Sequence, residues 1–136
     1  MPDNLPEGLL RVKQQAETFL SDVVEPLGRS VSINSEAVVR EASKAAGFYF
    51  KTQPQAYGGS PAGALELTVL RELFAAKNHP LTRCIFGPGP GVLHAAEGFL
   101  RDHYLRPVLA GSKRGAFAFT EPDTAHRPTW GVLNDD

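Results

Sequence analysis

The sequence contains a single cysteine, Cys84, among its 136 residues. One thiol cannot close an internal disulfide, and the chain has neither a CxxC pair nor a Cys/His cluster of the kind that holds structural zinc. His79, His94 and His103 have no second histidine or carboxylate at metal-ligand spacing. We therefore expect no disulfide framework and no metal site, and we interpret Cys84 as a buried apolar residue.

An excess of either charge sign is also missing, because 14 Lys and Arg residues stand against 15 Asp and Glu residues and leave a formal net charge of −1. The basic residues are scattered, so no basic stripe is available for nucleic-acid phosphates or an anionic membrane surface. No apolar run reaches the roughly 18 residues of a spanning helix. Residues 1–8 carry acids and prolines instead of a secretory signal. The sequence predicts a cytoplasmic protein that binds no nucleic acid and does not insert into a membrane.

Glycine and proline are abundant, with 13 and 11 residues, and many of them cluster in residues 53–63, 87–91 and 121–128. Such clusters divide a chain into segments. The glycines of residues 87–91 follow no strand and precede no Lys-Ser/Thr pair, so they do not predict a phosphate-binding loop. The 42% hydrophobic content is too high for a disordered tail and predicts a folded chain.

Apolar residues recur at helical spacing through most of the chain. This periodicity predicts helices over residues 6–24, 35–46, 60–76, 81–98 and 99–110. Ser35 and Ser60 are the expected N-caps of the second and third helices, and Gly47 is the expected end of the second. The fourth helix should be broken by residues 87–91, and Pro107 should distort the last one.

The periodicity changes after the last predicted helix. Residues 115–120 alternate small and large side chains, which predicts a β-strand that Glu121-Pro122 ends. A single strand leaves its backbone N–H and C=O groups without hydrogen-bond partners, so we expect partner strands outside this sequence. We therefore interpret the chain as roughly the first third of a larger protein. The predicted fold class is mainly α: an orthogonal bundle of about five helices with one C-terminal β-strand segment.

Two motifs in a fixed order carry a resemblance to a known family. Residues 102–122 spell DHYLRPVLAGSKRGAFAFTEP, and residues 55–59 spell QAYGG ahead of the predicted third helix. This pairing resembles the flavin-dependent acyl-CoA dehydrogenases, in which a Tyr-Gly-Gly turn precedes a helix. In that family a YLxPLxxG-like helix end also leads into a first β-strand ending in Thr-Glu-Pro. The resemblance implies an N-terminal helical domain over residues 1–112 and the start of a middle β-domain over residues 113–136.

The resemblance also implies an FAD cofactor beside the predicted strand. Phe117, Phe119 and Thr120 match positions at which backbone amides and the threonine hydroxyl hydrogen-bond the polar edge of the flavin, where charge develops on hydride arrival. The family continues with Gly-x-Gly-Ser-Asp, whereas this chain has Ala125 and His126 at the second glycine and the serine. His126 is thus the candidate for contact with substrate; the alternative interpretation is a solvated loop residue.

The implied activity is α,β-dehydrogenation of an acyl-CoA thioester, a reaction of fatty acid metabolism. This reaction needs a base opposite the flavin, and none of the chain's glutamates matches the family's base. We therefore assign no catalytic residue and expect the chain alone to be inactive. The resemblance further implies an oligomer of identical or different subunits. The alternatives are a split-enzyme subunit, or a non-enzymatic helical interaction module that docks on a full-length relative.

Overall fold

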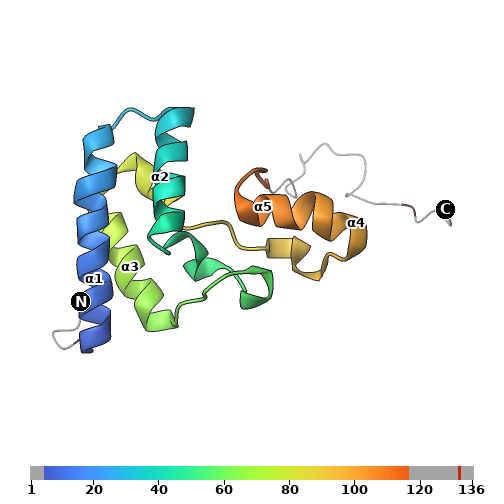
Figure 1. The fold of residues 1–136 in the computed structure, drawn as a ribbon, viewed down its shortest axis with the longest axis horizontal. Coiled ribbons are helices and arrows are strands. Elements are labelled where there is room, and N and C mark those ends of the chain that lie inside the picture. Colours follow the sequence, from blue (N-terminus) through green and yellow to red (C-terminus); the bar gives the residue numbers. More distant parts are fainter. Residues whose placement is uncertain (1–4, 117–131, 133–136) are drawn as a thin grey trace, which may run out of the picture.

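The computed structural model describes residues 5–116 and residue 132, and this part of the chain is mainly helical, with no β-strand (Figure 1). The longest helices are α1 (Glu7–Phe19), α2 (Ile33–Ala45) and α3 (Ala64–Ala76), which lie together at the N-terminal end of the molecule. The shorter helices α4 (Gly98–Leu100) and α5 (Arg106–Ala110) lie beside them. The mainly helical class is confirmed. None of the helices in residues 5–116 has the length and apolar character needed to cross a membrane.

The strand predicted over residues 115–120 is not found in the part of the chain that the structure describes. Gly115 and Ala116 have no regular secondary structure, and residues 117–120 lie outside the described residues. The start of the β-domain predicted from residue 113 onward therefore stays a prediction.

The first predicted helix, over residues 6–24, is found with a change of winding near its end. The α-helix α1 passes directly into a π-helical segment, Leu20–Val24, and then into a 3₁₀ turn, Glu25–Leu27. Ala16, Leu20 and Val24 are fully buried, so one apolar face continues through the change of winding. The helical path ends where Gly28 adopts a φ of +65°, a value that favours glycine.

The second helix begins three residues earlier than the sequence predicts. Ser32 is the N-cap of α2: its hydroxyl accepts a hydrogen bond from the Ser35 N–H (3.1 Å), and the Ser35 hydroxyl accepts one from the Ser32 N–H (2.9 Å). The prediction that Ser35 is the N-cap is wrong because Ser35 supplies the second half of this capping box. Gly47 has a φ of +81° just after the helix, and the predicted end is confirmed.

The third helix begins after Gly63, so the predicted N-cap at Ser60 is also wrong. The Ser60 N–H donates to the Phe50 carbonyl and the Ala62 N–H donates to the Lys51 carbonyl, each at 3.0 Å. These two hydrogen bonds hold residues 60–62 against the 3₁₀ helix Tyr49–Thr52, so that segment does not join α3. The apolar face predicted for this helix is found in part: Val69, Leu70 and Phe74 are buried, whereas Leu65, expected on the same face, is 50% exposed.

A chain of aromatic rings forms the centre of the core between α1, α2 and α3. Phe48 contacts Phe19 and Phe74 edge to face, with ring centroids 5.4 and 5.9 Å apart, and Phe74 contacts Phe86 at 5.5 Å. Around these rings pack the buried aliphatic residues Ala16, Leu20, Val24, Val39, Leu70, Leu81 and Ile85. The core thus brings together residues that precede the glycine-rich segment 53–63 and residues that follow it.

The fourth predicted helix is reduced to two short 3₁₀ helices, Pro80–Cys84 and Gly91–Ala95, on either side of residues 87–90. The last helix is continuous through α4, a π-helical segment (Arg101–Leu105) and α5. Pro107 has no N–H for the His103 carbonyl four residues earlier. The Lys113 ammonium donates to that carbonyl at 2.7 Å, and the helix ends at Gly111 with a φ of +80°. The distortion that the sequence predicts at Pro107 thus corresponds to the π-helical segment Arg101–Leu105 just before it.

Candidate functional site

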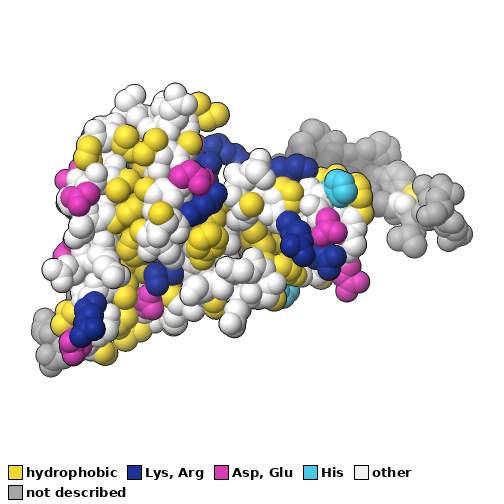
Figure 2. Space-filling view, in the orientation of Figure 1, with side chains coloured by type: hydrophobic (Ala, Val, Ile, Leu, Met, Phe, Trp, Pro, Cys, Tyr) yellow, Lys and Arg dark blue, Asp and Glu magenta, His cyan; other side chains and the backbone are white. Residues whose placement is uncertain are grey.

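A pocket of about 390 Å³ lies where α2, the 3₁₀ helix Pro80–Cys84 and the segment after α5 meet. Its charged lining consists of Glu36, Arg40, Arg83, Lys113 and Arg114. Four cationic side chains against one carboxylate leave a formal excess of three positive charges. Lys and Arg side chains are visible at the junction between the α1–α3 region and the α4–α5 region (Figure 2).

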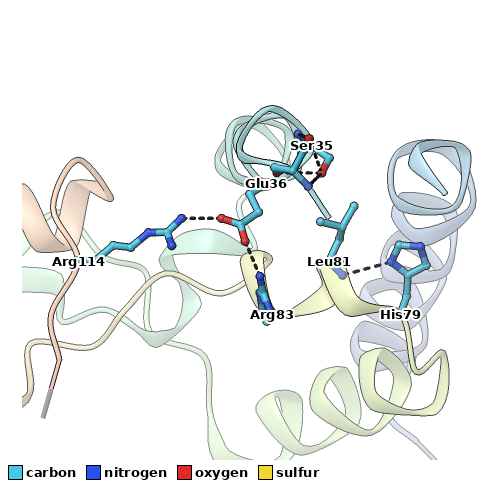
Figure 3. Close-up of polar contacts among 7 residues, drawn as sticks. Ser35, Glu36, His79, Leu81, Arg83 and Arg114 are labelled. Carbon is cyan, nitrogen blue, oxygen red and sulfur yellow. Dashed lines mark hydrogen bonds and ion pairs between the residues drawn. The ribbon is translucent and has the colours of Figure 1, made fainter. Parts of the chain in front are cut away.

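Glu36 on α2 contacts Arg83 and Arg114, which belong to two other segments of the chain, so three segments meet at this pocket (Figure 3). One carboxylate oxygen accepts from Arg83 Nη2 and the other from Arg114 Nη2, each at 2.5 Å. The Glu36 side chain is only 9% exposed, whereas both arginines are mostly exposed. The hydrogen bond from Arg83, and then that from Arg114, lowers the pKa of Glu36 below its ordinary value. The segment after α5 is thereby attached to the first turn of α2.

This arrangement predicts an acid-sensitive contribution to stability. Because the pKa of Glu36 is lower in the folded state than in the unfolded chain, its contribution is present above the ordinary pKa of 4.5 and is lost as pH falls through the folded-state pKa. We expect the free energy of unfolding of the wild type to fall more steeply below about pH 4.5 than that of Glu36→Gln. Chemical denaturation at a series of pH values measures this.

The control for the acid titration is Glu41→Gln, which removes an exposed carboxylate of α2 that forms an ion pair with Lys44. We expect its pH dependence to match the wild type. Equal slopes for wild type and Glu36→Gln below pH 4.5 would contradict the two-arginine contact.

Two hydrogen-bond donors on the pocket wall have no acceptor in the part of the chain that the structure describes. Arg40 on α2 forms no hydrogen bond or ion pair within the described part of the chain. Tyr49 is 1% exposed, and its buried hydroxyl has no hydrogen-bond partner among the described residues. Burial raises the pKa of Tyr49, so the hydroxyl keeps its proton at neutral pH. Among the described residues, the pocket therefore contains a guanidinium without an acidic partner and a phenol without an acceptor.

Gly111 brings the end of α5 against these two residues. A Cβ at this position would lie 2.6 Å from the Tyr49 hydroxyl oxygen and 3.0 Å from Arg40 Cδ. The φ of +80° also favours glycine here. Tyr49 and Arg40 thus lie next to the same point on the pocket wall.

Cys84 lines the same pocket. It is partly buried and packs against the hydrophobic core, so the buried apolar role predicted for it is found in part. Burial, and next the Glu36 charge, raises the pKa of the thiol, which is therefore protonated at neutral pH and a weak nucleophile. No group of three or more His, Cys, Asp or Glu side chains is placed to hold a metal ion anywhere in residues 5–116.

The structure does not test the site residues predicted from the sequence. Phe117, Phe119, Thr120 and His126 all lie outside the described residues. In turn, sequence reasoning missed the charged pocket. Glu36 contacts arginines 47 and 78 residues away along the chain, a separation that no local motif signals.

Comparisons with models of known protein families, with curated proteins and with solved structures find no match to this chain.

Proposed function

We propose that this chain is the N-terminal part of an acyl-CoA dehydrogenase-like flavoprotein. In this proposal residues 1–112 form an orthogonal helical bundle and residues 113–136 begin a β-domain. The assembled protein removes two hydrogens from an acyl-CoA thioester, with FAD as hydride acceptor. The mainly helical structure of residues 5–116 supports the proposed architecture.

The observation that supports this most is that three of the four glycines of the resembling motifs, Gly58, Gly59 and Gly111, lie where the backbone needs glycine. Gly58 ends the 3₁₀ helix Gln55–Tyr57 with a φ of +83°. At Gly59 a Cβ would overlap the carbonyl group of Gln53, and Gly111 has a φ of +80° against Tyr49. Glycine thus permits the observed backbone conformation within both motifs. We expect this if the motifs have the same structural role here as in the family that the chain resembles.

The segment that leads to the proposed flavin residues is attached to the helical part. Ser112 and Lys113 donate their backbone N–H groups to the Pro107 carbonyl at 3.0 and 3.1 Å, and Arg114 binds Glu36. This attachment holds residues 112–114, just before the proposed flavin residues, against α2 and the end of α5.

The donor chemistry of those residues fits a flavin. Strand amides at Phe117 and Phe119 and the Thr120 hydroxyl would hold the polar edge of FAD, which supplies hydride acceptance when bound. His126 would contact the acyl-CoA thioester. None of the chain's glutamates matches the family's base, so α-proton abstraction is assigned to another chain segment or subunit.

Purification of the native assembly tests this proposal. We expect the protein, tagged at residue 1 and isolated from its own cells, to carry a flavin absorbance band that an acyl-CoA thioester bleaches without oxygen. Residues 1–136 expressed alone are expected to be inactive in dye-linked acyl-CoA oxidation. A colourless native assembly that reduces no dye with acyl-CoA contradicts the proposal.

A second candidate function is supported by the apolar surface near α4. Val92, Phe99, Leu100 and Tyr104 are 79%, 63%, 53% and 45% exposed. Exposed apolar groups of this kind are typical of surfaces that contact another protein. In this alternative the chain is a non-enzymatic module that docks on a full-length relative. It predicts that the flavin and the activity stay with the relative after the chain is stripped away, whereas the first proposal predicts that both are lost.

A further inference from the structure

We propose that the pocket between α2, the 3₁₀ helix Pro80–Cys84 and the segment after α5 binds a phosphate group through Arg40 and Tyr49. None of the residues that line this pocket is among those assigned to FAD and acyl-CoA, and the inference does not rest on the proposed function. It begins from the two donors that lack acceptors on one wall of the pocket.

Tyr49 provides the first step of the argument. Buried polar groups in folded proteins nearly always have a hydrogen-bond partner, because burying one without a partner costs free energy. The Tyr49 hydroxyl is an exception among the described residues, although its ring is firmly held. Its neighbours at this point include the Gly111 backbone and the stem of Arg40, which give it no acceptor. A ligand with an accepting oxygen would complete its bonding.

Arg40 indicates that this ligand is an anion. Its guanidinium carries five N–H donors and always keeps its charge. The nearby carboxylate of Glu36 accepts from Arg83 and Arg114, and its described hydrogen bonds and ion pairs do not include one with Arg40. The guanidinium can only donate hydrogen bonds, and the buried phenol has an O–H to donate, so together they favour a group with several accepting oxygens.

The other charged groups facing the pocket favour a dianion over a monoanion. Arg83 and Arg114 more than offset the Glu36 charge, and the ammonium of Lys113 adds to the positive field although it donates to the His103 carbonyl. A phosphate carries more charge and more accepting oxygens than a carboxylate. The volume of about 390 Å³ falls in the range of small-molecule sites, so it also accommodates a phosphate joined to a larger group.

Binding measurements on residues 1–136 test the site. Inorganic phosphate, ADP and acetate are titrated separately, with calorimetry for affinity and the amide signals of Tyr49 and Gly111 for location. We expect saturable binding of phosphate or ADP that shifts both signals, and much weaker binding of acetate. Tighter binding of ADP than of phosphate at the same signals identifies a nucleotide as the source of the group, whereas equal or weaker binding of ADP identifies free phosphate.

Paired variants connect the binding to the proposed donors. Tyr49→Phe removes one oxygen and keeps the packing, and Arg40→Gln removes the charge; each is expected to weaken binding about tenfold or more. Tyr57→Phe and Arg71→Gln are the matched controls, because neither residue lines this pocket, and we expect no change for either. Thermal melting verifies that all four variants are folded.

The absence of an acceptor predicts a second signature for Tyr49→Phe. Without phosphate the variant is expected to melt at the same temperature as the wild type or higher, because the removed hydroxyl makes no bond. Three results overturn the proposal: no saturable binding of phosphate or ADP, unchanged affinity in both pocket variants, or acetate binding as tightly as phosphate.

Discussion

Replacing Phe48 by alanine is expected to lower the free energy of unfolding by about 3–5 kcal/mol, the typical cost of removing a large aromatic side chain from a core. Phe48 is 2% exposed and its ring lies between those of Phe19 and Phe74. The substitution removes both edge-to-face contacts and leaves a cavity that α1 and α3 border. Chemical denaturation followed by circular dichroism measures the change.

Two further variants determine whether the loss comes from the core. Phe48→Leu keeps most of the volume and should cost less than the alanine variant. Phe99→Ala removes the same side chain from a position that is 63% exposed, and we expect a change of no more than about 1 kcal/mol. A Phe48→Ala variant as stable as Phe99→Ala would contradict the central place of Phe48 in the core.

Replacing Gly59 by alanine is expected to cost about 1–3 kcal/mol, as overpacking of a closely fitted site does. A Cβ at residue 59 would overlap the carbonyl group of Gln53 and lie 2.8 Å from the Gln53 Cβ. Gln53 does not move freely, because it is 2% exposed and its side-chain amide donates to the Leu109 carbonyl at 2.8 Å. Any adjustment at Gly59 therefore disturbs the contact between residues 49–53 and α5.

Gly8→Ala is the matched control for this prediction. Gly8 lies in the first turn of α1. Apart from its chain neighbours and the helix backbone, no atom of the described residues comes within 4 Å of a Cβ built there. Because alanine favours helix more than glycine does, we expect this variant to be as stable as the wild type or slightly more stable. If Gly59→Ala and Gly8→Ala have the same stability, the close approach of Gly59 to Gln53 is not present in solution.

The sequence predicts the long helices because burying one helix face leaves a local signature. The apolar spacing in residues 6–24 and 60–76 is enough to identify α1 and α3 and most of their buried residues. The start of α3 could not be predicted in this way, because the N–H groups of Ser60 and Ala62 donate hydrogen bonds to the carbonyls of residues 50 and 51. Such hydrogen bonds depend on how the chain folds back and have no sequence signature of their own.

The candidate pocket is less predictable than the helices for the same reason. Arg83 and Arg114 meet Glu36 only after the chain has folded, and Tyr49 shows its unpaired hydroxyl only when its surroundings are known. Tyr49 belongs to the aromatic run Phe48-Tyr49-Phe50, and its side chain is buried. Its position on the wall of a positively charged pocket follows from the structure alone.

Product analysis of the native assembly tests the proposed function most directly. The assembly, tagged at residue 1, is incubated with a saturated acyl-CoA thioester and a dye acceptor, and the mass of the thioester is measured before and after. We predict conversion to the α,β-unsaturated thioester with matching reduction of the dye, and slower conversion in a Thr120→Val variant. A thioester that keeps its mass while the assembly remains intact would contradict the assignment of this chain to a flavin-dependent acyl-CoA dehydrogenase.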